Sequence, residues 1–189
     1  MNLYLLLVVI SALCLGLQFE PLHSLSQWQR GDILAGQWWR ILTGNFTHTN
    51  FAHLAMNLLG LWVISSIFRP KTQALLRALL VASLAVGIGN LATSMNIYVG
   101  LSGALHGLFG YFALLEALSG RRSSWLLVTG LIAKIVWEHL FGASETTSAM
   151  IHARVAIESH LAGALSGLAL ALLERLMAHQ RQSNTNKNA

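Results

Sequence analysis

Charged residues are scarce in this chain. Only 10% of its 189 residues are Asp, Glu, Lys or Arg, whereas a water-soluble domain uses about 25% to cover its surface. Hydrophobic residues make up 54% of the chain, and the mean hydropathy is +0.57. These values exclude an ordinary soluble domain, and we expect most of the chain to lie in lipid.

The chain has a single cysteine, and its first apolar run is not preceded by basic residues. Cys14 is the only cysteine, which excludes an intramolecular disulfide. No Lys or Arg precedes the first apolar run, and no small-x-small cleavage site follows it. The pattern therefore differs from that of a signal peptide, and we interpret this run as a membrane helix.

Six apolar runs are present, each long or nearly long enough to cross a bilayer as a helix of about 20 residues. They occupy residues 3–17, 51–68, 75–91, 101–118, 125–141 and 155–177. We therefore predict an all-α membrane protein, with one six-transmembrane-helix bundle in residues 1–179. The polar tail at residues 180–189 is predicted to be disordered.

Lys and Arg lie mainly on one side of this arrangement. If the N-terminus is cytoplasmic, three basic residues lie in the outer loops, namely Arg30, Arg40 and Arg154. The inner loops and the tail hold eight, namely Arg69, Lys71, Arg77, Arg121, Arg122, Arg175, Arg181 and Lys187. The positive-inside rule then places both termini in the cytoplasm. The basic pI is thus a topology signal, and no nucleic-acid partner is predicted.

Polar side chains within the apolar runs are the candidates for function, because a polar group in hydrocarbon is costly unless it is paired or wetted. They are His53 and Asn57 in the second run, Ser102 and His106 in the fourth, Lys134, Glu138 and His139 in the fifth, and His160 in the sixth. Residues four apart share one helix face, as His53 and Asn57 do. With the predicted topology, four of these residues lie toward the outer half of the membrane, namely His53, Asn57, Ser102 and His160.

Two of the runs also carry glycines spaced four apart. They are Gly103 and Gly107 in the fourth run and Gly163 and Gly167 in the sixth. Such strips allow two helix backbones to approach closely, and they follow directly on Ser102 and His160. We therefore expect this serine and this imidazole at matching depth on two packed helices. Nucleophilic catalysis requires such a pair, because a base must take the proton of the weakly acidic hydroxyl.

These residues resemble motifs of the rhomboid intramembrane serine proteases. Gly100-Leu101-Ser102-Gly103 is similar to their Gly-x-Ser-Gly motif, and His160-x-x-Gly163-x-x-x-Gly167 is similar to the motif of their sixth helix. The resemblance extends to Trp39-Arg40 in the first loop, to His48 and His53 five residues apart, and to His53-x-x-x-Asn57. It runs from about Trp39 to the end of the sixth run, in the same order.

The resemblance implies an acyl-enzyme mechanism that uses a Ser-His dyad without an acidic third member. Ser102 is then the nucleophile and His160 the general base, while His53 and Asn57 donate hydrogen bonds to the oxyanion. It also implies structural or gating roles, which fall on Trp39, Arg40, His48, Gly100, Gly103, Gly163 and Gly167. No cofactor is implied.

One position departs from the family pattern. Rhomboids commonly carry an aromatic residue, usually Tyr, four residues after the serine, and this chain has His106 there. The compact six-span form most resembles the rhombosortase branch. Membership of that branch implies membrane-anchored protein substrates with a C-terminal Gly-Gly motif, an apolar helix and a basic end. It also implies a bacterial inner membrane protein whose site opens to the periplasm.

Other protease classes and a metal site are not predicted. The only aspartate is Asp32, which excludes a two-aspartate membrane protease, and no His-Glu-x-x-His motif is present. The membrane histidines have no carboxylate or cysteine to complete a metal site. Lys134 and Glu138 are four apart, so we expect them to neutralise each other in a structural pair.

Two non-enzymatic functions remain as alternatives. The first is a catalytically inactive rhomboid relative with a binding or quality-control role, although such relatives generally lose the serine or the histidine. The second is a small transporter, which would favour internal repeat symmetry that the sequence does not contain.

Overall fold

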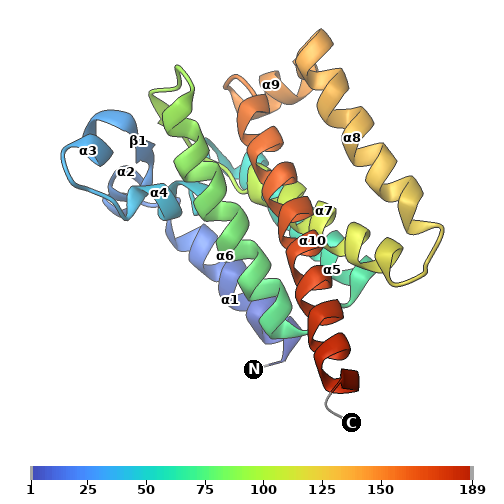
Figure 1. The fold of residues 1–189 in the computed structure, drawn as a ribbon. Coiled ribbons are helices and arrows are strands. Elements are labelled where there is room, and N and C mark those ends of the chain that lie inside the picture. The colour runs from blue at the N-terminus through green and yellow to red at the C-terminus, as the bar shows by residue number, and fades with distance from the viewer. Residues whose placement is uncertain (1, 188–189) are drawn as a thin grey trace.

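The computed structural model describes residues 2–187 and consists mainly of helices (Figure 1). Its long helices are α1 (Leu3–Gly16), α5 (Phe51–Phe68), α6 (Thr72–Gly89), α7 (Ser102–Leu118), α8 (Ser124–Phe141) and α10 (Ile157–Lys187). The connections hold the short elements α2 (Leu22–Ser26), β1 (Trp28–Gln29), α3 (Arg30–Leu34), α4 (Arg40–Thr43), η1 (Gly44–Phe46), η2 (Asn90–Ala92), β2 (Ile97–Tyr98) and α9 (Glu145–Ile151). The strands β1 and β2 pair antiparallel, with Trp28 opposite Tyr98.

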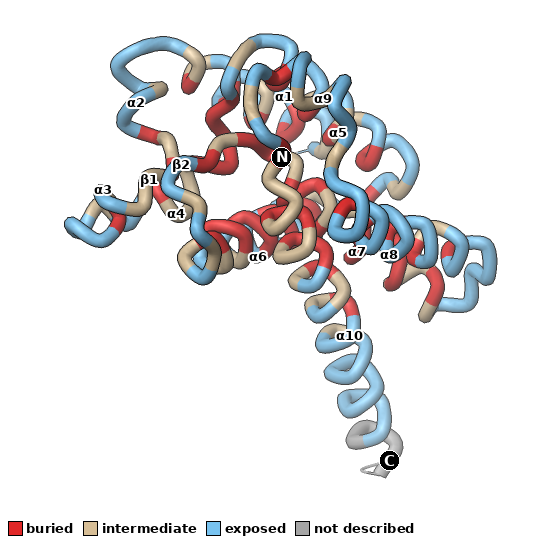
Figure 2. The backbone as a smooth tube through the Cα atoms, turned by 90° about the horizontal axis from the view of Figure 1, so that it is seen from above, coloured by how far each residue is buried: buried red, intermediate tan, exposed pale blue. Residues whose placement is uncertain are grey.

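Helix α7 forms the centre of the bundle and packs against α5, α6, α8 and α10. Most of its residues are buried, whereas the outer faces of the surrounding helices are exposed (Figure 2). Exposed leucine and isoleucine side chains on those faces, such as Leu59, Ile88 and Leu126, are unfavourable in water and favourable in lipid. The distribution of apolar residues is thus that of a bundle in a bilayer.

Four helices of the described region are long and apolar enough to cross a membrane: Phe51–Phe68, Thr72–Ala92, Ser124–Phe141 and Ile157–Ser183. Helix α1 is apolar but has only 14 residues. Helix α7 has 17 residues and contains His106 and Glu116, which is tolerable because its neighbours, rather than lipid, surround it. The six-span count therefore stays a prediction.

The predicted disordered tail differs from the structure. Helix α10 continues to Lys187, so residues 180–187 are helical, and residues 188–189 lie outside the described part of the chain. The tail sequence has few breaking residues, with no Pro or Gly after Gly167, and an existing helix extends more easily than a new one forms. The prediction of disorder rested on the low apolar content of the tail. A segment of this composition is not expected to form a buried core, but it can still form a helix that is exposed to water.

Close backbone contact joins α7 and α10. A Cβ atom placed on Gly163 would lie 1.8 Å from the carbonyl oxygen of Gly103, and one on Gly167 would lie 1.9 Å from that of Gly107. Atoms cannot approach this closely, so only glycine is compatible with this spacing. The two helices that begin near Ser102 and His160 are thus held together along their length.

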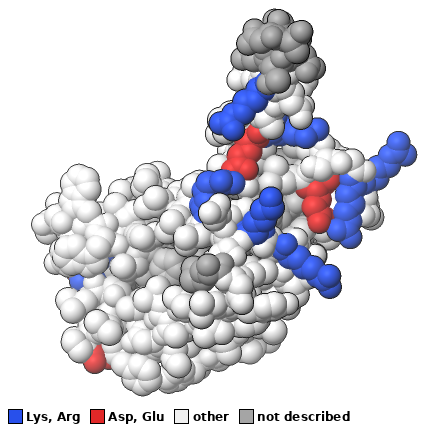
Figure 3. All heavy atoms as spheres, turned by 90° about the horizontal axis from the view of Figure 1, so that it is seen from below, with Lys and Arg blue, Asp and Glu red and all other residues white. Residues whose placement is uncertain are grey.

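The two ends of the bundle differ in charge. Helix α1 begins and helix α10 ends at the same end of the bundle (Figure 1), and Lys and Arg gather around this end in the view from below (Figure 3). Helix α7 begins at Ser102 and ends at Leu118, three residues before Arg121. Ser102 therefore lies toward the opposite end of the bundle from this basic cluster.

Candidate active site

Ser102 and His160 meet at the N-terminal ends of α7 and α10. The distance from Ser102 Oγ to His160 Nε2 is 2.9 Å, which is hydrogen-bond length. His160 is almost completely buried, with 4% of its surface exposed. The glycine contacts between the two helices explain this proximity, because they bring the two backbones together directly below both side chains.

Glu138 of α8 contacts the other nitrogen of His160. Its Oε2 lies 2.9 Å from His160 Nδ1, and its Oε1 accepts a hydrogen bond of 2.7 Å from Lys134 Nζ. Since a carboxylate only accepts, His160 Nδ1 carries the proton, and Nε2 is left to accept the proton of Ser102. The expectation that no acidic residue accompanies Ser102 and His160 is therefore wrong.

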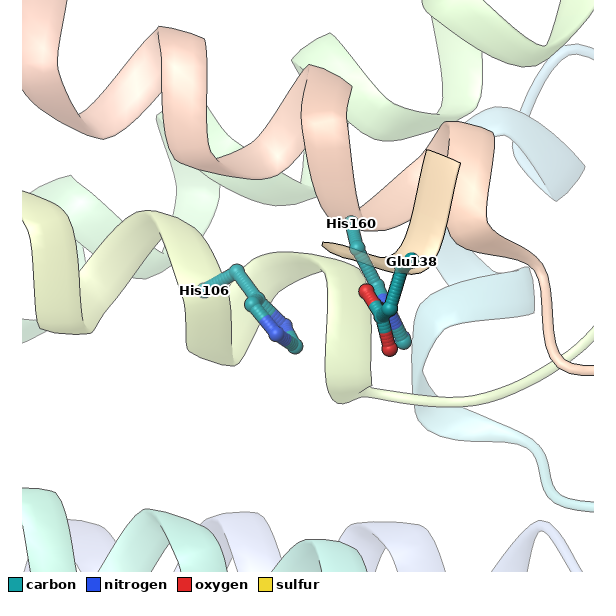
Figure 4. Close-up of side chains that lie close together, drawn as sticks. All are labelled: His106, Glu138 and His160. Atoms are coloured by element: carbon teal, nitrogen blue, oxygen red, sulfur yellow. The ribbon is translucent and has the colours of Figure 1, made fainter. Parts of the chain in front are cut away.

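His106 lies against the ring of His160 (Figure 4). The two imidazole planes are inclined by 19°, and their centroids are 4.1 Å apart. His106 Nδ1 lies 2.7 Å from the backbone oxygen of Ser102, which fixes the orientation of the ring. His106 thus contacts one face of His160, as an aromatic residue at this position would.

The serine and the histidine open into a cavity of about 380 Å³. His53 and Asn57 of α5 line the same cavity, together with the segment around Tyr98 and the segment that precedes α10. Asn57 Nδ2 is buried and has no hydrogen-bond partner. An unpaired buried donor costs free energy, so this amide is available for a ligand in the cavity.

Gly100 allows His53 and Asn57 to approach the loop before α7. Its φ is +126°, which L side chains rarely adopt. A Cβ atom there would lie 2.8 Å from His53 Nε2 and 3.6 Å from Asn57 Nδ2. The loop is fixed from both sides, since Tyr98 donates its hydroxyl to the Gly100 oxygen and Gly100 N–H donates to the Gly44 oxygen. Burial raises the pKa of Tyr98, so its phenol stays protonated and acts as a hydrogen-bond donor.

Residues at the start of α5 position His53. Asn50 caps the helix, because its side chain accepts from the His53 N–H at 2.8 Å. The Thr49 N–H donates to His53 Nδ1 at 3.5 Å, and the Thr49 hydroxyl donates to the Ile151 oxygen of α9. The Thr49 hydroxyl oxygen also lies 3.1 Å from His53 Nδ1. These contacts hold the ring with its other nitrogen, Nε2, facing Gly100.

The three predicted residues of the first loop lie at different distances from the site. Arg40 is buried and binds Asp32 and the oxygens of Ser24 and Gln27, so it stabilises the loop itself. Trp39 is half exposed and donates to the Leu25 oxygen. Only the third member of the set, His48, touches a residue that lines the cavity.

His48 packs edge-on against His53, with centroids 5.0 Å apart. Burial, followed by the neighbouring His53 and His23, lowers the pKa of His48 to about 3. Its imidazole is therefore neutral near pH 7 and places no positive charge beside the cavity.

A metal could be considered at His106, Glu138 and His160, whose ligand atoms lie within 4.8 Å of one another. The expectation that no carboxylate accompanies the membrane histidines is therefore wrong. The geometry nevertheless fits hydrogen bonding better. The two imidazole planes are nearly parallel, so their in-plane lone pairs do not converge on one ion, and both His160 nitrogens already have partners.

Residues 35–176 match the family model of the Rhomboid domain. The chain belongs to the rhomboid family. It is also 28% identical over 171 residues to "Putative rhomboid protease YdcA" of Bacillus subtilis (strain 168), in an alignment that covers 81% of this chain and 78% of the relative.

The predicted family and the enzyme class, a rhomboid-type serine protease, are therefore confirmed. The helical membrane fold is confirmed as well. Rhomboid proteases act on membrane-embedded protein substrates. The rhombosortase branch and the roles of individual residues stay predictions.

Glu138 is the residue of the site that sequence reasoning missed. Its pairing with Lys134 is as expected, but the contact with His160 was not anticipated. A signal was available, because Glu138 lies near the end of the fifth run and His160 near the beginning of the sixth. Two such positions on consecutive antiparallel helices lie at similar depth.

Proposed function

We propose that this rhomboid is an active intramembrane endopeptidase in which Ser102 is the nucleophile and His160 the general base. The observation that carries the proposal is the 2.9 Å contact between Ser102 Oγ and His160 Nε2 at a cavity large enough for a peptide segment. An inactive relative, the main alternative, would have no need of this contact.

The reaction follows from the positions of the protons. Ser102 Oγ attacks the carbonyl carbon of the scissile bond while its proton passes to His160 Nε2, which gives a tetrahedral oxyanion. When the oxyanion collapses, the C–N bond breaks, and His160 returns the proton to the leaving amine. Water, or another nucleophile, then releases the acyl group from Ser102 by the same two steps.

The oxyanion requires hydrogen-bond donors on the side of the cavity opposite His160. We assign this role to Asn57 Nδ2, to His53 Nε2 and to the Ser102 backbone N–H. The Ser102 N–H lies at the N-terminus of a helix, where the dipole favours negative charge. The unpaired state of Asn57 Nδ2 supports the assignment, since the donor gains its partner only when charge develops on the substrate.

Replacing Asn57 with alanine is expected to lower kcat by about 10²- to 10³-fold, the usual effect of losing one oxyanion donor. Stability should be unchanged or higher, because the variant removes an unpaired buried donor and alanine is the better helix former. Cleavage kinetics and thermal unfolding in detergent test both expectations.

Ser65→Ala is a matched control, because Ser65 is a buried polar residue of the same helix without a hydrogen-bond partner. It should retain full activity. Equal activity of Asn57→Ala and Ser65→Ala would contradict the role of Asn57.

For topology, we propose six spans, with both termini in the cytoplasm of a bacterium and the cavity open to the periplasm. The position of the basic residues at the end opposite Ser102 supports this orientation. Substrates are membrane-anchored proteins, and the sequence resemblance to rhombosortases favours those with a C-terminal Gly-Gly motif, an apolar helix and a basic end.

Two reporters expressed with the protease in membranes test the substrate class. One ends in Gly-Gly, an apolar helix and basic residues, and the other is a generic single-span rhomboid substrate. Serine-dependent cleavage of the first alone would support the specialised class, and cleavage of the second would indicate a general rhomboid. If neither is cut, labelling of Ser102 by a serine-reactive phosphonate would separate an unmet substrate from an inactive relative.

A further inference from the structure

We propose that Glu138 is a positioning residue for catalysis, so that the site works as a Ser102-His160-Glu138 triad. The inference rests on the proposed function, because it concerns how His160 becomes an effective base. Glu138 touches only the imidazole. Its role is to hold the ring in the productive tautomer and to compensate the charge that the ring acquires in the transition state.

The geometry of His160 supports this role. The ring has partners on both nitrogens, Ser102 Oγ at 2.9 Å and Glu138 Oε2 at 2.9 Å. Without the carboxylate, Nδ1 and Nε2 would compete for the single proton of the neutral ring. Protonation of Nε2 in the resting state would leave Ser102 without a base. The contact with Glu138 places the proton on Nδ1.

Glu138 divides its two oxygens between two partners. Oε1 binds Lys134 Nζ at 2.7 Å, and Oε2 binds His160 Nδ1. A pair that serves only to neutralise charge on α8 would need the first contact alone. The Glu138 side chain is 11% exposed and the Lys134 side chain 49%, so the acid is directed inward to the histidine and the lysine lies on its outer side.

The surroundings give the carboxylate a further reason to remain charged and fixed. An isolated carboxylate is unfavourable at this depth in a membrane, and Lys134 supplies the compensating charge within the same helix turn. The other titratable groups near His160 are His106 on α7 and His53 on α5. Neither of them is hydrogen-bonded to Nδ1, and within the described part of the chain Glu138 is the group that contacts this nitrogen.

Glu138→Gln tests the proposal, because it keeps the size of the side chain and removes its charge. A fluorophosphonate that reacts with Ser102 gives a readout without a known substrate. At saturating probe, the labelling rate should fall by about 10²-fold, while the half-saturating concentration changes by less than threefold. Glu138→Asp, which retains the charge on a shorter side chain, should label at least tenfold faster than Glu138→Gln.

Glu174→Gln is the matched control. Glu174 also accepts from two groups, Arg77 at 2.7 Å and the Tyr111 hydroxyl at 2.7 Å, but these lie elsewhere in the bundle. Its loss should affect unfolding and leave the labelling rate within threefold of wild type. A structural role of Glu138 would give the same result as Glu174→Gln.

The outcomes are separable. If wild type labels at Ser102 and Glu138→Gln labels less than fivefold more slowly, the triad is wrong and the proposed function stands. If wild type does not label, or if Ser102→Ala labels equally, the proposed function itself fails. A fall of fivefold or more that Glu138→Asp partly restores, at unchanged unfolding temperature, supports the triad. The same fall without restoration overturns it.

Discussion

Replacing Ser102 with alanine is expected to lower the rate of substrate cleavage by about 10⁵- to 10⁶-fold, close to the loss seen when a serine protease loses its nucleophile. The reason is chemical, because alanine has no oxygen to form the acyl-enzyme. The change removes a single atom that is not needed for packing, so expression and unfolding temperature should match wild type. Reporter cleavage in membranes measures the loss of proteolysis, and phosphonate labelling measures the loss of the nucleophile independently.

The same mechanism predicts that losses at the pair do not add. His160→Ala should be nearly as slow as Ser102→Ala, and the double variant should be no slower than either, because each residue depends on the other. Additive losses would mean that the two side chains act separately. Serine-independent cleavage by Ser102→Ala would contradict the catalytic assignment altogether.

Much of this site could be predicted from sequence because the information is local. Ser102 precedes one glycine pair and His160 precedes another. In a membrane helix, the spacing of small residues reports directly which face packs on a neighbour. Depth within the bilayer then adds a second coordinate, and the two signals together are enough to place the two side chains near each other.

Glu138 illustrates what such reasoning misses. Its neighbour Lys134 offers a sufficient explanation on the same helix, and a satisfied pair gives no reason to look for a partner on another element. The contact of the second carboxylate oxygen with His160 depends on the rotation of α8 relative to α10, which the sequence pattern does not specify. The contacts of Trp28 are likewise not specified by the sequence pattern. This aromatic residue of the first loop is fully buried and donates to the Gly87 oxygen of another element.

Gly163→Ala is expected to cause the second large loss of activity, at least about 100-fold, although Gly163 makes no contact with substrate. The added Cβ would lie 1.8 Å from the Gly103 oxygen, so α7 and α10 must separate by more than 1 Å to restore an ordinary contact of about 3 Å or longer. Cores respond poorly to such overpacking, which commonly costs about 1–3 kcal/mol. Thermal unfolding and phosphonate labelling should both report the change.

Gly130→Ala controls for the loss of a helical glycine, because Gly130 lies in α8 with open space around it. There alanine should be neutral or slightly stabilising.

In Gly163→Ala, separation of α7 from α10 would lengthen the 2.9 Å contact between Ser102 and His160, and a hydrogen bond weakens as its length leaves the usual range. The labelling rate of Gly163→Ala should therefore fall even in protein that remains folded. If folded Gly163→Ala labels as fast as Gly130→Ala, the spacing of these helices does not set the geometry of the catalytic pair.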